Sequence, residues 1–573
     1  MAIVVSAFVS LTLTPMMASR FLKSEKEVKH GRLYQWSERA FDRLLKGYER
    51  GLDFVLDHRF PTLLVFLATL ALSVVLFVMI PKGFFPQQDT GLITGISEMG
   101  QDTSFVELAR HQAALGEVVA KDPAIDHVAM AVGGSGNPLN TGRMFITLKP
   151  RDQRDVTADQ VIRRLQPELD KVEGARLFLQ AAQDVRVGGR ASRTQYQYTL
   201  QDPDLGELNQ WAPKVLDRLK TLKELRDVAT DQQIAGSTLT LKVDRDQASR
   251  YGLTMQVIDD TLYDAFGQRQ IAQYFTQLAS YHVIMEILPE LQGEVDSLDK
   301  IYLKSPTTST QVPLSTFAKW TTVPVQPLSI SHQSQFPAIT ISFNLAPSVA
   351  LGQATDAIDQ AKQQLNLPPT VTTSFQGNAQ AFQESLSTVP LLIVGALIVV
   401  YLVLGVLYES YIHPITILST LPSAGVGALL MLMLFGFDFS VIALIGVILL
   451  IGIVKKNGIM LVDFAIVAER REKKSAHDAI RQAALLRFRP IMMTTFAALL
   501  GGVPLMLGTG TGSEIRQPLG YAMVGGLIVS QALTLFTTPV IYLYLDGLSD
   551  RLKGWQASLF SGTGRRARIR RLT

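Results

Sequence analysis

The chain of 573 residues contains no cysteine, so disulfides, thiolate metal sites and cysteine nucleophiles are all excluded. Its eight histidines are scattered and show no metal-ligand spacing. A GxxxxGKS/T phosphate loop is absent, so the chain does not look driven by ATP on its own. The net charge of +4 is small for this length and gives little support to nucleic-acid binding. We therefore expect no enzyme, no cofactor, no metal site and no nucleic-acid partner.

Charged residues make up only 18% of the chain and hydrophobic residues 47%, a composition typical of membrane proteins. Apolar runs long enough to cross a bilayer lie at 60–80, 388–408, 412–435, 439–468, 490–508 and 519–545. Residues 1–19 are also apolar but shorter. Because no basic segment precedes them, we favour a membrane helix truncated at its N-terminal end over a signal peptide.

Basic residues cluster at 20–59, at 470–489 and in the tail, where they are Arg565, Arg566, Arg568, Arg570 and Arg571. The positive-inside rule places these segments in the cytoplasm. The short connections 436–438 and 509–518 carry one basic residue, Arg516, and alternate correctly as outside loops. The order of the spans then places the block from Pro81 to about Ser387 on the non-cytoplasmic side of the membrane.

The cytoplasmic segment 31–57 has apolar residues at spacings of three and four: Leu33, Trp36, Phe41, Leu44, Leu45, Tyr48, Leu52 and Val55. Its other face carries basic residues: Arg39, Arg43, Lys46 and Arg50. This pattern predicts an amphipathic helix that lies in the inner-leaflet interface. A helix packed on a soluble partner is the alternative.

Between 81 and 387, short β runs alternate with amphipathic helices, as in a soluble α+β domain. The first unit is predicted as strand 91–97, helix 104–121, strands 127–132 and 143–148, helix 158–172 and strand 176–180, in the βαββαβ order of a ferredoxin-like motif. The second unit begins with strand 195–200 and helix 205–222. It finishes with strand 338–343, helix 351–364 and strand 371–375. An insertion of about 238–325 separates its two parts, and the repetition suggests a cleft between the units.

The residues Lys455-Lys456-Asn457 lie in the middle of the apolar run 439–468. A lysine near the bilayer centre costs roughly 2.5–3.5 kcal/mol, and the apolar stretches on both sides make the site too deep for simple snorkelling. Such a cation indicates an ion or proton pathway with an acidic partner on a neighbouring helix. No other apolar run in this sequence offers a carboxylate at comparable depth.

Several long motifs resemble one family. They are PKGFFPQQDTG (81–91), RTQYQYTLQ (193–201), FGQRQI (266–271), YESYIHPITILSTLPSAGVGALL (408–430), LLIGIVKKNGIMLVDFA (449–465) and LLRFRPIMMTT (485–495). With the order of spans and outer block, they resemble the C-terminal half of a resistance–nodulation–division (RND) multidrug efflux transporter. The MdtB/MdtC-type inner-membrane subunits are the most similar, and residues 1–19 resemble the tail of the sixth helix.

The resemblance implies a polytopic α-helical membrane protein with a large periplasmic α+β block of ferredoxin-like (βαββαβ) porter subdomains and an inserted docking lobe. The implied division is a truncated transmembrane helix at 1–19, a cytoplasmic linker with the interfacial helix at 20–59 and a transmembrane helix at 60–80. The first porter subdomain then occupies 81–180, the second 181–237 with 329–376, and the docking lobe 238–328. Five transmembrane helices at 388–545 and a basic cytoplasmic tail at 546–573 complete the chain.

The implied activity is drug:proton antiport in the cell inner membrane, driven by the proton motive force. Lys456 matches the family's relay lysine, which pairs with two aspartates on a helix absent from this sequence. Thr494 matches a relay threonine, and Arg487 an arginine at the cytoplasmic proton exit. The alternative for Lys456 is a structural cation, and the alternative for Thr494 is a hydroxyl bonded to its own helix. For Arg487 the alternative is a basic residue that only sets topology. We regard Lys455, Asn457 and Asp463 as supporting polar groups.

The loop Gly133-Gly134-Ser135-Gly136-Asn137 resembles the family's flexible loop between binding pockets, and its glycines indicate mobility. Drug pumps of the family place phenylalanines in this loop, whereas this sequence has none, which suggests a narrower or more polar set of substrates. Phe145 is a candidate pocket wall, although a buried strand phenylalanine is the blander explanation.

The resemblance further implies a homo- or heterotrimer, a periplasmic adaptor protein, an outer-membrane channel and small amphiphilic substrates. Because the relay aspartates and the first porter pair are absent from the sequence, the chain is expected to be incomplete alone. A non-transporting membrane scaffold that assembles with an adaptor or partner subunit is the alternative function. The long insertion argues against a third possibility, a protein-export auxiliary of the same superfamily.

Overall fold

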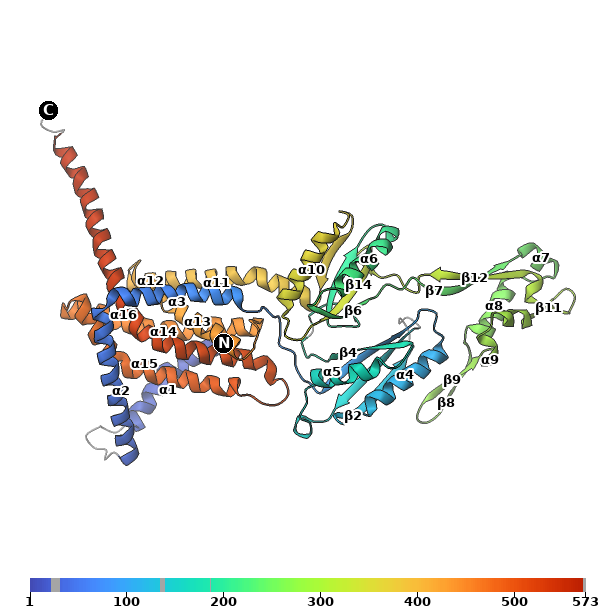
Figure 1. The fold of residues 1–573 in the computed structure, drawn as a ribbon, viewed down its shortest axis with the longest axis horizontal. Coiled ribbons are helices and arrows are strands. Elements are labelled where there is room, and N and C mark those ends of the chain that lie inside the picture. The colour runs from blue at the N-terminus through green and yellow to red at the C-terminus, as the bar shows by residue number, and fades with distance from the viewer. Residues whose placement is uncertain (22–30, 134–139, 186, 570–573) are drawn as a thin grey trace.

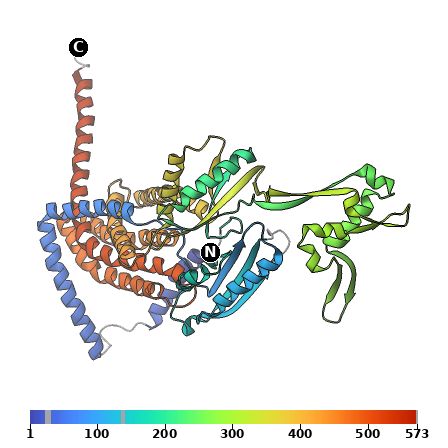
Figure 2. The ribbon, with the colours of Figure 1, turned by 45° about the vertical axis from the view of Figure 1, so that its right-hand side comes forward.

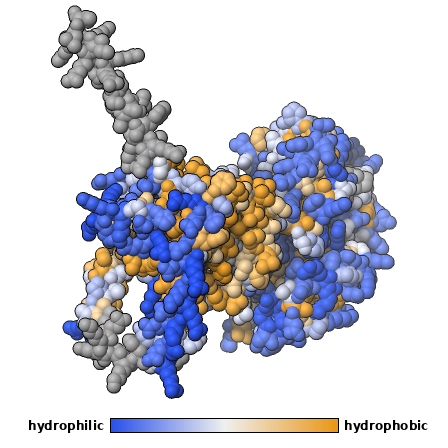
Figure 3. All heavy atoms as spheres, turned by 60° about the vertical axis from the view of Figure 1, so that its left-hand side comes forward, coloured by the Kyte–Doolittle hydropathy of each residue, from blue (hydrophilic) through white to orange (hydrophobic). Residues whose placement is uncertain are grey.

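The computed structural model describes residues 1–21, 31–133, 140–185 and 187–569. The molecule is elongated, with a bundle of long helices at one end, two α/β units in the middle and a small distal lobe at the far end (Figure 1). This arrangement separates the apolar runs of the sequence from its mixed α/β segments. A belt of hydrophobic residues covers the helical bundle, bounded by hydrophilic surface on both sides (Figure 3).

Seven helical segments among the described residues are long and apolar enough to cross a membrane. We call them span helices: α1 (Ala2–Phe21), α3 (Arg59–Met79), α11 (Asn378–Tyr408), the pair α12 (His413–Leu418) and α13 (Leu421–Leu434), α14 (Val441–Glu472), α15 (Ala476–Met506) and α16 (Ser513–Ile569). Each corresponds to an apolar run in the sequence. Two extend further than predicted: α15 begins well before residue 490, and α16 continues to Ile569, through most of the segment predicted as a tail.

The helix α2 (Arg32–Asp57) runs across the ends of the span helices rather than along them (Figure 1). Its second half is packed on this chain, because Tyr48, Leu52 and Leu56 are buried in a cluster with residues of α14, α15 and α16. Arg481 of α15 donates to both carboxylate oxygens of Asp53 at 2.6 and 2.9 Å. The apolar face of the second half of α2 is therefore covered by the chain's own spans.

The first α/β unit has a four-stranded sheet in the order β2-β3-β1-β4, with every neighbouring pair antiparallel. Its elements are β1 (Leu92–Met99), α4 (Phe105–Ala120), β2 (Ile125–Val132), β3 (Thr141–Leu148), the short 3₁₀ turn η2 (Arg151–Gln153), α5 (Ala158–Leu169) and β4 (Ala175–Ala181). Ser104 caps α4, and Thr157 forms a capping box with Gln160 at the start of α5. Both helices contribute buried leucines to the core under the sheet.

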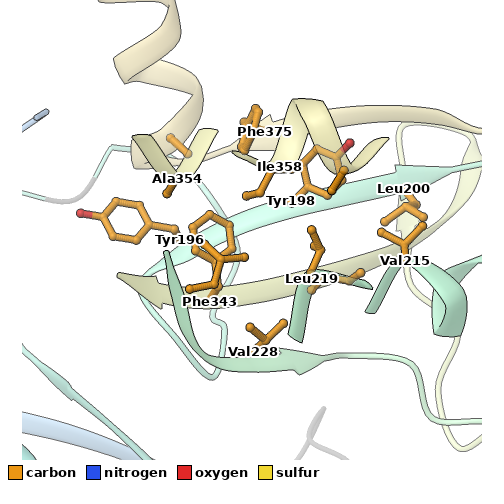
Figure 4. Packing of buried hydrophobic residues seen from close by; sticks show 14 of the residues in the cluster. Tyr196, Tyr198, Leu200, Val215, Leu219, Val228, Phe343, Ala354, Ile358 and Phe375 are labelled. Carbon is orange, nitrogen blue, oxygen red and sulfur yellow. The ribbon is translucent and has the colours of Figure 1, made fainter. Parts of the chain in front are cut away.

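The second unit repeats this topology, with strands in the order β6-β14-β5-β15. Its elements are β5 (Tyr196–Gln201), α6 (Leu205–Lys220), β6 (Leu225–Thr230), the two-residue β13 (His332–Gln333), β14 (Phe336–Leu345), α10 (Leu351–Leu365) and β15 (Thr372–Gln376). Tyr198, Leu200 and Phe343 lie on the sheet beneath α6 and α10 (Figure 4). The strand β6 was not predicted from the sequence, because it is only six residues long and contains charged residues.

The insertion between β6 and β14 forms the distal lobe. A two-stranded ribbon, β7 (Gly236–Val243) with β12 (Ala318–Gln326), carries it away from the second unit (Figures 1 and 2). The lobe contains α7 (Arg245–Arg250), α8 (Met255–Phe266), β8 (Arg269–Phe275), β9 (Ser280–Met285), α9 (Pro289–Gln292), η3 (Val295–Lys300), β10 (Tyr302–Lys304), β11 (Gln311–Pro313) and η4 (Leu314–Thr316). It has its own small core, which includes Leu253, Ile258 and Phe317.

The segment after α3 joins the α/β block to the span helices through backbone hydrogen bonds. Phe439 N–H donates to the carbonyl of Pro81 at 2.8 Å, and Val441 N–H donates to the carbonyl of Phe84 at 3.1 Å. A buried ion pair lies next to this joint. Arg154 donates to both oxygens of Asp89 at 2.6 and 2.7 Å.

Candidate functional site

Lys456 lies near the middle of α14, on a side of the helix that no other described part of the chain covers. Exposed positions recur on one side of α14 and form a stripe: Ile445, Leu449, Gly452 and Lys456 at spacings of three and four, and Asp463 and Val467 beginning two turns further on. The stripe faces outward from the bundle. Asp463 on the same stripe makes no ion pair with Lys456, so we expect the counter-charge of the Lys456 ammonium to lie outside the described bundle.

Ion pairs that the structure describes around the helical bundle lie at its two ends. At the α2 end they are Lys474–Glu472, His477–Asp478 and Arg481 with Glu49 and Asp53; at the opposite end the pair is Arg151–Glu514. None of them involves Lys455 or Lys456. Within the described residues, the membrane-embedded lysines thus lack the acidic partner that the sequence also failed to supply.

Asn457, adjacent to Lys456, is buried and points into the bundle. Its Nδ2 group donates to Thr495 Oγ1 of α15 and to Gln531 Oε1 of α16, both at 3.2 Å. Thr495 Oγ1 in turn donates to Gln531 Oε1 at 2.8 Å. These three side chains tie α14, α15 and α16 together in the apolar interior, where interhelical hydrogen bonds of this kind are worth about 0.6–2 kcal/mol each.

The other predicted relay residues occupy different environments. The hydroxyl of Thr494 donates to the carbonyl of Ile491 in its own helix at 3.1 Å, so the cross-helix threonine in this structure is its neighbour Thr495. The Arg487 guanidinium lies 3.4 Å from the centre of the Phe464 ring. Asp463 is exposed on the same stripe as Lys456, and Lys455 is half-buried.

The interhelical hydrogen bonds of Thr495 and Gln531 were not predicted from the sequence. Gln531 is the one carboxamide in the apolar run 519–545, and an isolated amide in such a run is a usable signal for an interhelical bond. The sequence alone does not show which of Thr494 and Thr495 bonds to a neighbouring helix, because both lie in the same helical turn.

Among the predicted substrate-path residues, Gly134, Ser135, Gly136 and Asn137 lie outside the described residues. Gly133 is described and has a φ of 74°, a left-handed conformation that glycine adopts without strain. It follows β2 and lies next to the Phe105 ring of α4. The backbone at Gly133 thus suits a sharp change of direction after the strand.

Phe145 is not buried in the core of its sheet, which was the alternative to a role in a pocket, because 52% of its surface is exposed. It lies on β3 and lines a cavity of about 200 Å³ between the two α/β units. The other walls include Gln180 of β4 and, from the second unit, Arg190 and Gln197. An aromatic face opposite polar side chains suits a small amphiphilic ligand.

A second cavity, of about 760 Å³, lies where both α/β units meet the outer ends of the span helices. Its walls include Phe85, Arg226 and Asp438. Asp438, in the turn between α13 and α14, packs so closely on Gly83 that an added Cβ there would lie 2.9 Å from the Asp438 Cβ. Burial raises the pKa of the Asp438 carboxyl to about 6, which brings its charge change close to neutral pH.

Within the described residues, no group of three or more His, Asp or Glu side chains is arranged to hold a metal ion.

The fold and the site describe a polytopic helical membrane protein with a two-unit α/β block. A model of the AcrB/AcrD/AcrF family matches residues 1–546, and the chain therefore belongs to this family of RND transporters. The family predicted from the sequence motifs is thus confirmed, as is the presence of apolar helices long enough to span a membrane.

Two solved crystal structures of a heavy metal efflux pump, in crystal forms I and II, resemble this chain. They superpose with TM-scores of 0.76 and 0.77, at 22% sequence identity in both cases. The matches cover 88% and 89% of this chain but 51% and 53% of theirs. The chain spans about half the length of the solved structures it matches, and at this identity the likeness shows the fold.

Proposed function

We propose that this protein exports small amphiphilic molecules from the cell in exchange for protons, as the C-terminal half of an inner-membrane RND pump of the MdtB/MdtC type. The observation that carries the proposal is the Lys456 ammonium, which lies on the open stripe of α14 and has no acidic partner among the described residues. A cation at this depth is costly, and in membrane proteins such residues serve ion or proton pathways. Membership of the AcrB/AcrD/AcrF family favours transport over the alternative of a passive scaffold.

In the proposed mechanism, Lys456 pairs with carboxylates on a helix outside these 573 residues. Protonation of those carboxylates weakens the ion pair and frees the ammonium. Asn457 follows Lys456 in α14 and is bonded to Thr495 and Gln531, so a movement of α14 would be passed to α15 and α16. Thr494 and Arg487 would complete the proton path, with Lys455 and Asp463 as supporting groups.

Substrates would pass between the two α/β units, which serve as the porter subdomains. The exposed Phe145 and the polar walls of its cavity support an amphiphilic cargo. The loop at 133–137 contains no aromatic residue, which favours a narrower or more polar substrate range than that of drug pumps with phenylalanines there. Movement of one unit against the other would open and close this cavity.

The proposed assembly is a trimer in the inner membrane, with a related subunit or with copies of itself. The α/β block would lie in the periplasm, because the basic segments near α2 and after α14 mark the cytoplasmic side. The distal lobe at the far end of the molecule would then face an outer-membrane channel and a periplasmic adaptor (Figure 1).

A heavy-metal ion is the second candidate cargo, because the two matching structures are described as a heavy metal efflux pump. Soft metal ions are bound best by cysteine thiolates and methionine thioethers. This chain has no cysteine, so methionines would have to supply the soft ligands. We therefore place organic amphiphiles first and include metal ions in the test.

The test is efflux of a fluorescent cationic dye from cells that lack their own drug pumps. The chain is expressed together with a polypeptide that supplies the other half of a matching transporter. Lys456→Met should lower efflux to the level seen with a protonophore, while Lys220→Met, at a side chain of α6 that is 49% exposed, should leave efflux unchanged. Normal efflux by Lys456→Met would overturn the proposed relay.

Two further measurements address the counter-charge and the cargo. If the chain expressed alone shows protonophore-sensitive dye efflux, a carboxylate from another polypeptide is not needed, and that part of the proposal is wrong. Resistance to copper, silver or zinc salts without any dye efflux would replace the amphiphilic cargo with a metal ion.

A further inference from the structure

A groove of about 450 Å³ lies on the outside of the helical bundle, where α2 meets α15 and α16. Its rim is exposed to the surroundings of the bundle, since Leu44 is 48%, Phe496 is 47% and Ile528 is 49% exposed. Tyr48, Leu499 and Phe536 form its deeper walls. The groove adjoins the network of Asn457, Thr495 and Gln531 and is separate from the two cavities described above.

The polar side chains at the base of the groove are turned to other partners. Thr495 and Gln531 line it, but their oxygen atoms take part in the network with Asn457. The Gln531 Nε2 group is directed to the sulfur of Met492 at 3.2 Å. The Tyr48 hydroxyl donates to the carbonyl of Leu535 at 3.0 Å. What remains for an occupant is an almost wholly apolar surface.

The size of the groove limits what can fill it. An α-helix is about 10 Å across and rises about 5.4 Å per turn, so a volume of 450 Å³ admits about one turn of helix. A membrane helix of another chain would need a groove several turns long. A flexible hydrocarbon chain, by contrast, can follow a short, narrow apolar channel. The dimensions favour a lipid acyl chain over a protein segment.

A positively charged side chain lies next to the groove-lining residues. Arg489, one residue beyond the groove-lining Phe488, places its guanidinium 5.5 Å from the centre of the Phe41 ring of α2. It makes no ion pair with any described carboxylate, and its side chain is exposed. A cation beside an apolar groove at the interface is complementary to a lipid phosphate, because anionic lipid surfaces attract basic residues that lie close to them.

We propose that this groove binds one acyl chain of an anionic phospholipid from the leaflet on the α2 side, with the lipid phosphate held at the rim by Arg489. The bound chain would fill the space between α2 and the two span helices. It would also pack against Thr495 and Gln531, which connect to the residue beside Lys456. The proposal stands on the groove itself and does not depend on proton-coupled transport.

The test uses the full chain in lipid nanodiscs of phosphatidylcholine with a small fraction of phosphatidylglycerol that carries a photoreactive group on one acyl chain. After irradiation, labelled peptides are identified by mass spectrometry. We expect labelling of α15 between Met492 and Leu499 and of α16 between Ile528 and Phe536. An excess of unreactive phosphatidylglycerol should suppress this labelling in the unaltered protein.

Two variants sharpen the experiment. Ala532 lines the groove, whereas Ala497 is exposed on α15 outside it. Ala532→Phe should fill the groove and lower the labelling about tenfold, and Ala497→Phe should leave it unchanged. Arg489→Gln should lower labelling by the phosphatidylglycerol probe but not by a phosphatidylcholine probe of the same chain length.

Three results would contradict the proposal. Equal labelling of Ala532→Phe and Ala497→Phe would show non-specific contact with bulk lipid and would overturn the proposal. So would labelling of the groove that unreactive phosphatidylglycerol does not suppress. Cross-links from a photoreactive residue at Ile528 to another protein chain, in place of lipid, would assign the groove to a protein partner.

Discussion

At the residue scale, the groups that pack around a charged side chain determine how well its charge is stabilised. Lys456 and Asp438 lie on the same helix or just before it, yet their surroundings differ. The ammonium of Lys456 lies on an uncovered stripe of α14, where its solvation depends on whatever packs against that stripe. The carboxyl of Asp438 is partly buried within this chain and lines the 760 Å³ cavity. Lys456 has no acidic partner among the described residues, whereas burial within this chain already raises the pKa of Asp438.

Asp438 leads to a prediction about pH. The pKa of its carboxyl rises from the ordinary 3.8 to about 6 on folding, so the folded state holds the proton more tightly than the unfolded state. Stability should therefore fall as the pH rises from about 4 to about 6 and stay lowered above that. Asp438→Asn should remove this loss and stabilise the protein at pH 7.5 by up to about 3 kcal/mol.

Thermal unfolding in detergent at pH 4 and at pH 7.5 checks this prediction. The unaltered protein and Asp438→Asn should unfold at similar temperatures at pH 4 and separate at pH 7.5. Asp217→Asn, at a side chain that is 76% exposed, serves as the control and should show no such separation. A variant that is less stable at pH 7.5 would contradict the proposed role of burial.

At the element scale, small residues allow two span helices to approach closely. Gly427 of α13 faces Gly525 of α16, and a Cβ on Gly427 would lie 2.4 Å from the carbonyl oxygen of Gly525. Ser423 and Ser530 add a hydrogen bond of 3.3 Å between the same helices. Membrane helices gain stability from such packing because apolar burial alone does not drive them together in lipid.

Gly427→Ala is expected to destabilise the bundle, because backbone atoms rather than a flexible side chain oppose the new methyl group. The expected loss is about 1–3 kcal/mol. Gly452→Ala on α14 is the matched control, since a Cβ there meets nothing within 4 Å. Denaturation in detergent should show a lower stability for the first variant and no loss for the second. Equal stability of the two would contradict the close-packing argument.

At the scale of the whole molecule, ion pairs join the two α/β units that share one topology. Arg193, just before β5, donates to both carboxylate oxygens of Glu98 on β1 at 2.6 and 2.7 Å. Both side chains are largely buried. This bidentate pair holds the two sheets in their observed relation.

Arg193→Gln should leave the Glu98 carboxylate without its partner and loosen the contact between the units, at a cost of about 3 kcal/mol. Amide hydrogen exchange should become faster in β1 and β5. Lys171→Gln breaks the exposed pair with Glu168, whose side chains are 67% and 58% exposed, and should change exchange very little. Exchange unchanged by Arg193→Gln would mean that other contacts hold the units together.

Much of the fold follows from local pattern. Apolar run length predicted the span helices, and alternation predicted most strands of the α/β units. The strand Leu225–Thr230 was missed because its residues look like a solvated loop until it pairs with β14. The break between α12 and α13 within one apolar run was also missed, since both halves are equally apolar.

By itself, the sequence determined the class of this protein: a polytopic membrane chain with a lysine inside an apolar helix and a large α/β insertion. Those properties depend on composition and on neighbours along the chain. The tertiary structure alone decided that Thr495 rather than Thr494 reaches Asn457, that Phe145 is exposed in a cavity, and that Lys456 lies on an open stripe. These depend on contacts between residues far apart in sequence, which the packing of the helices and sheets brings together.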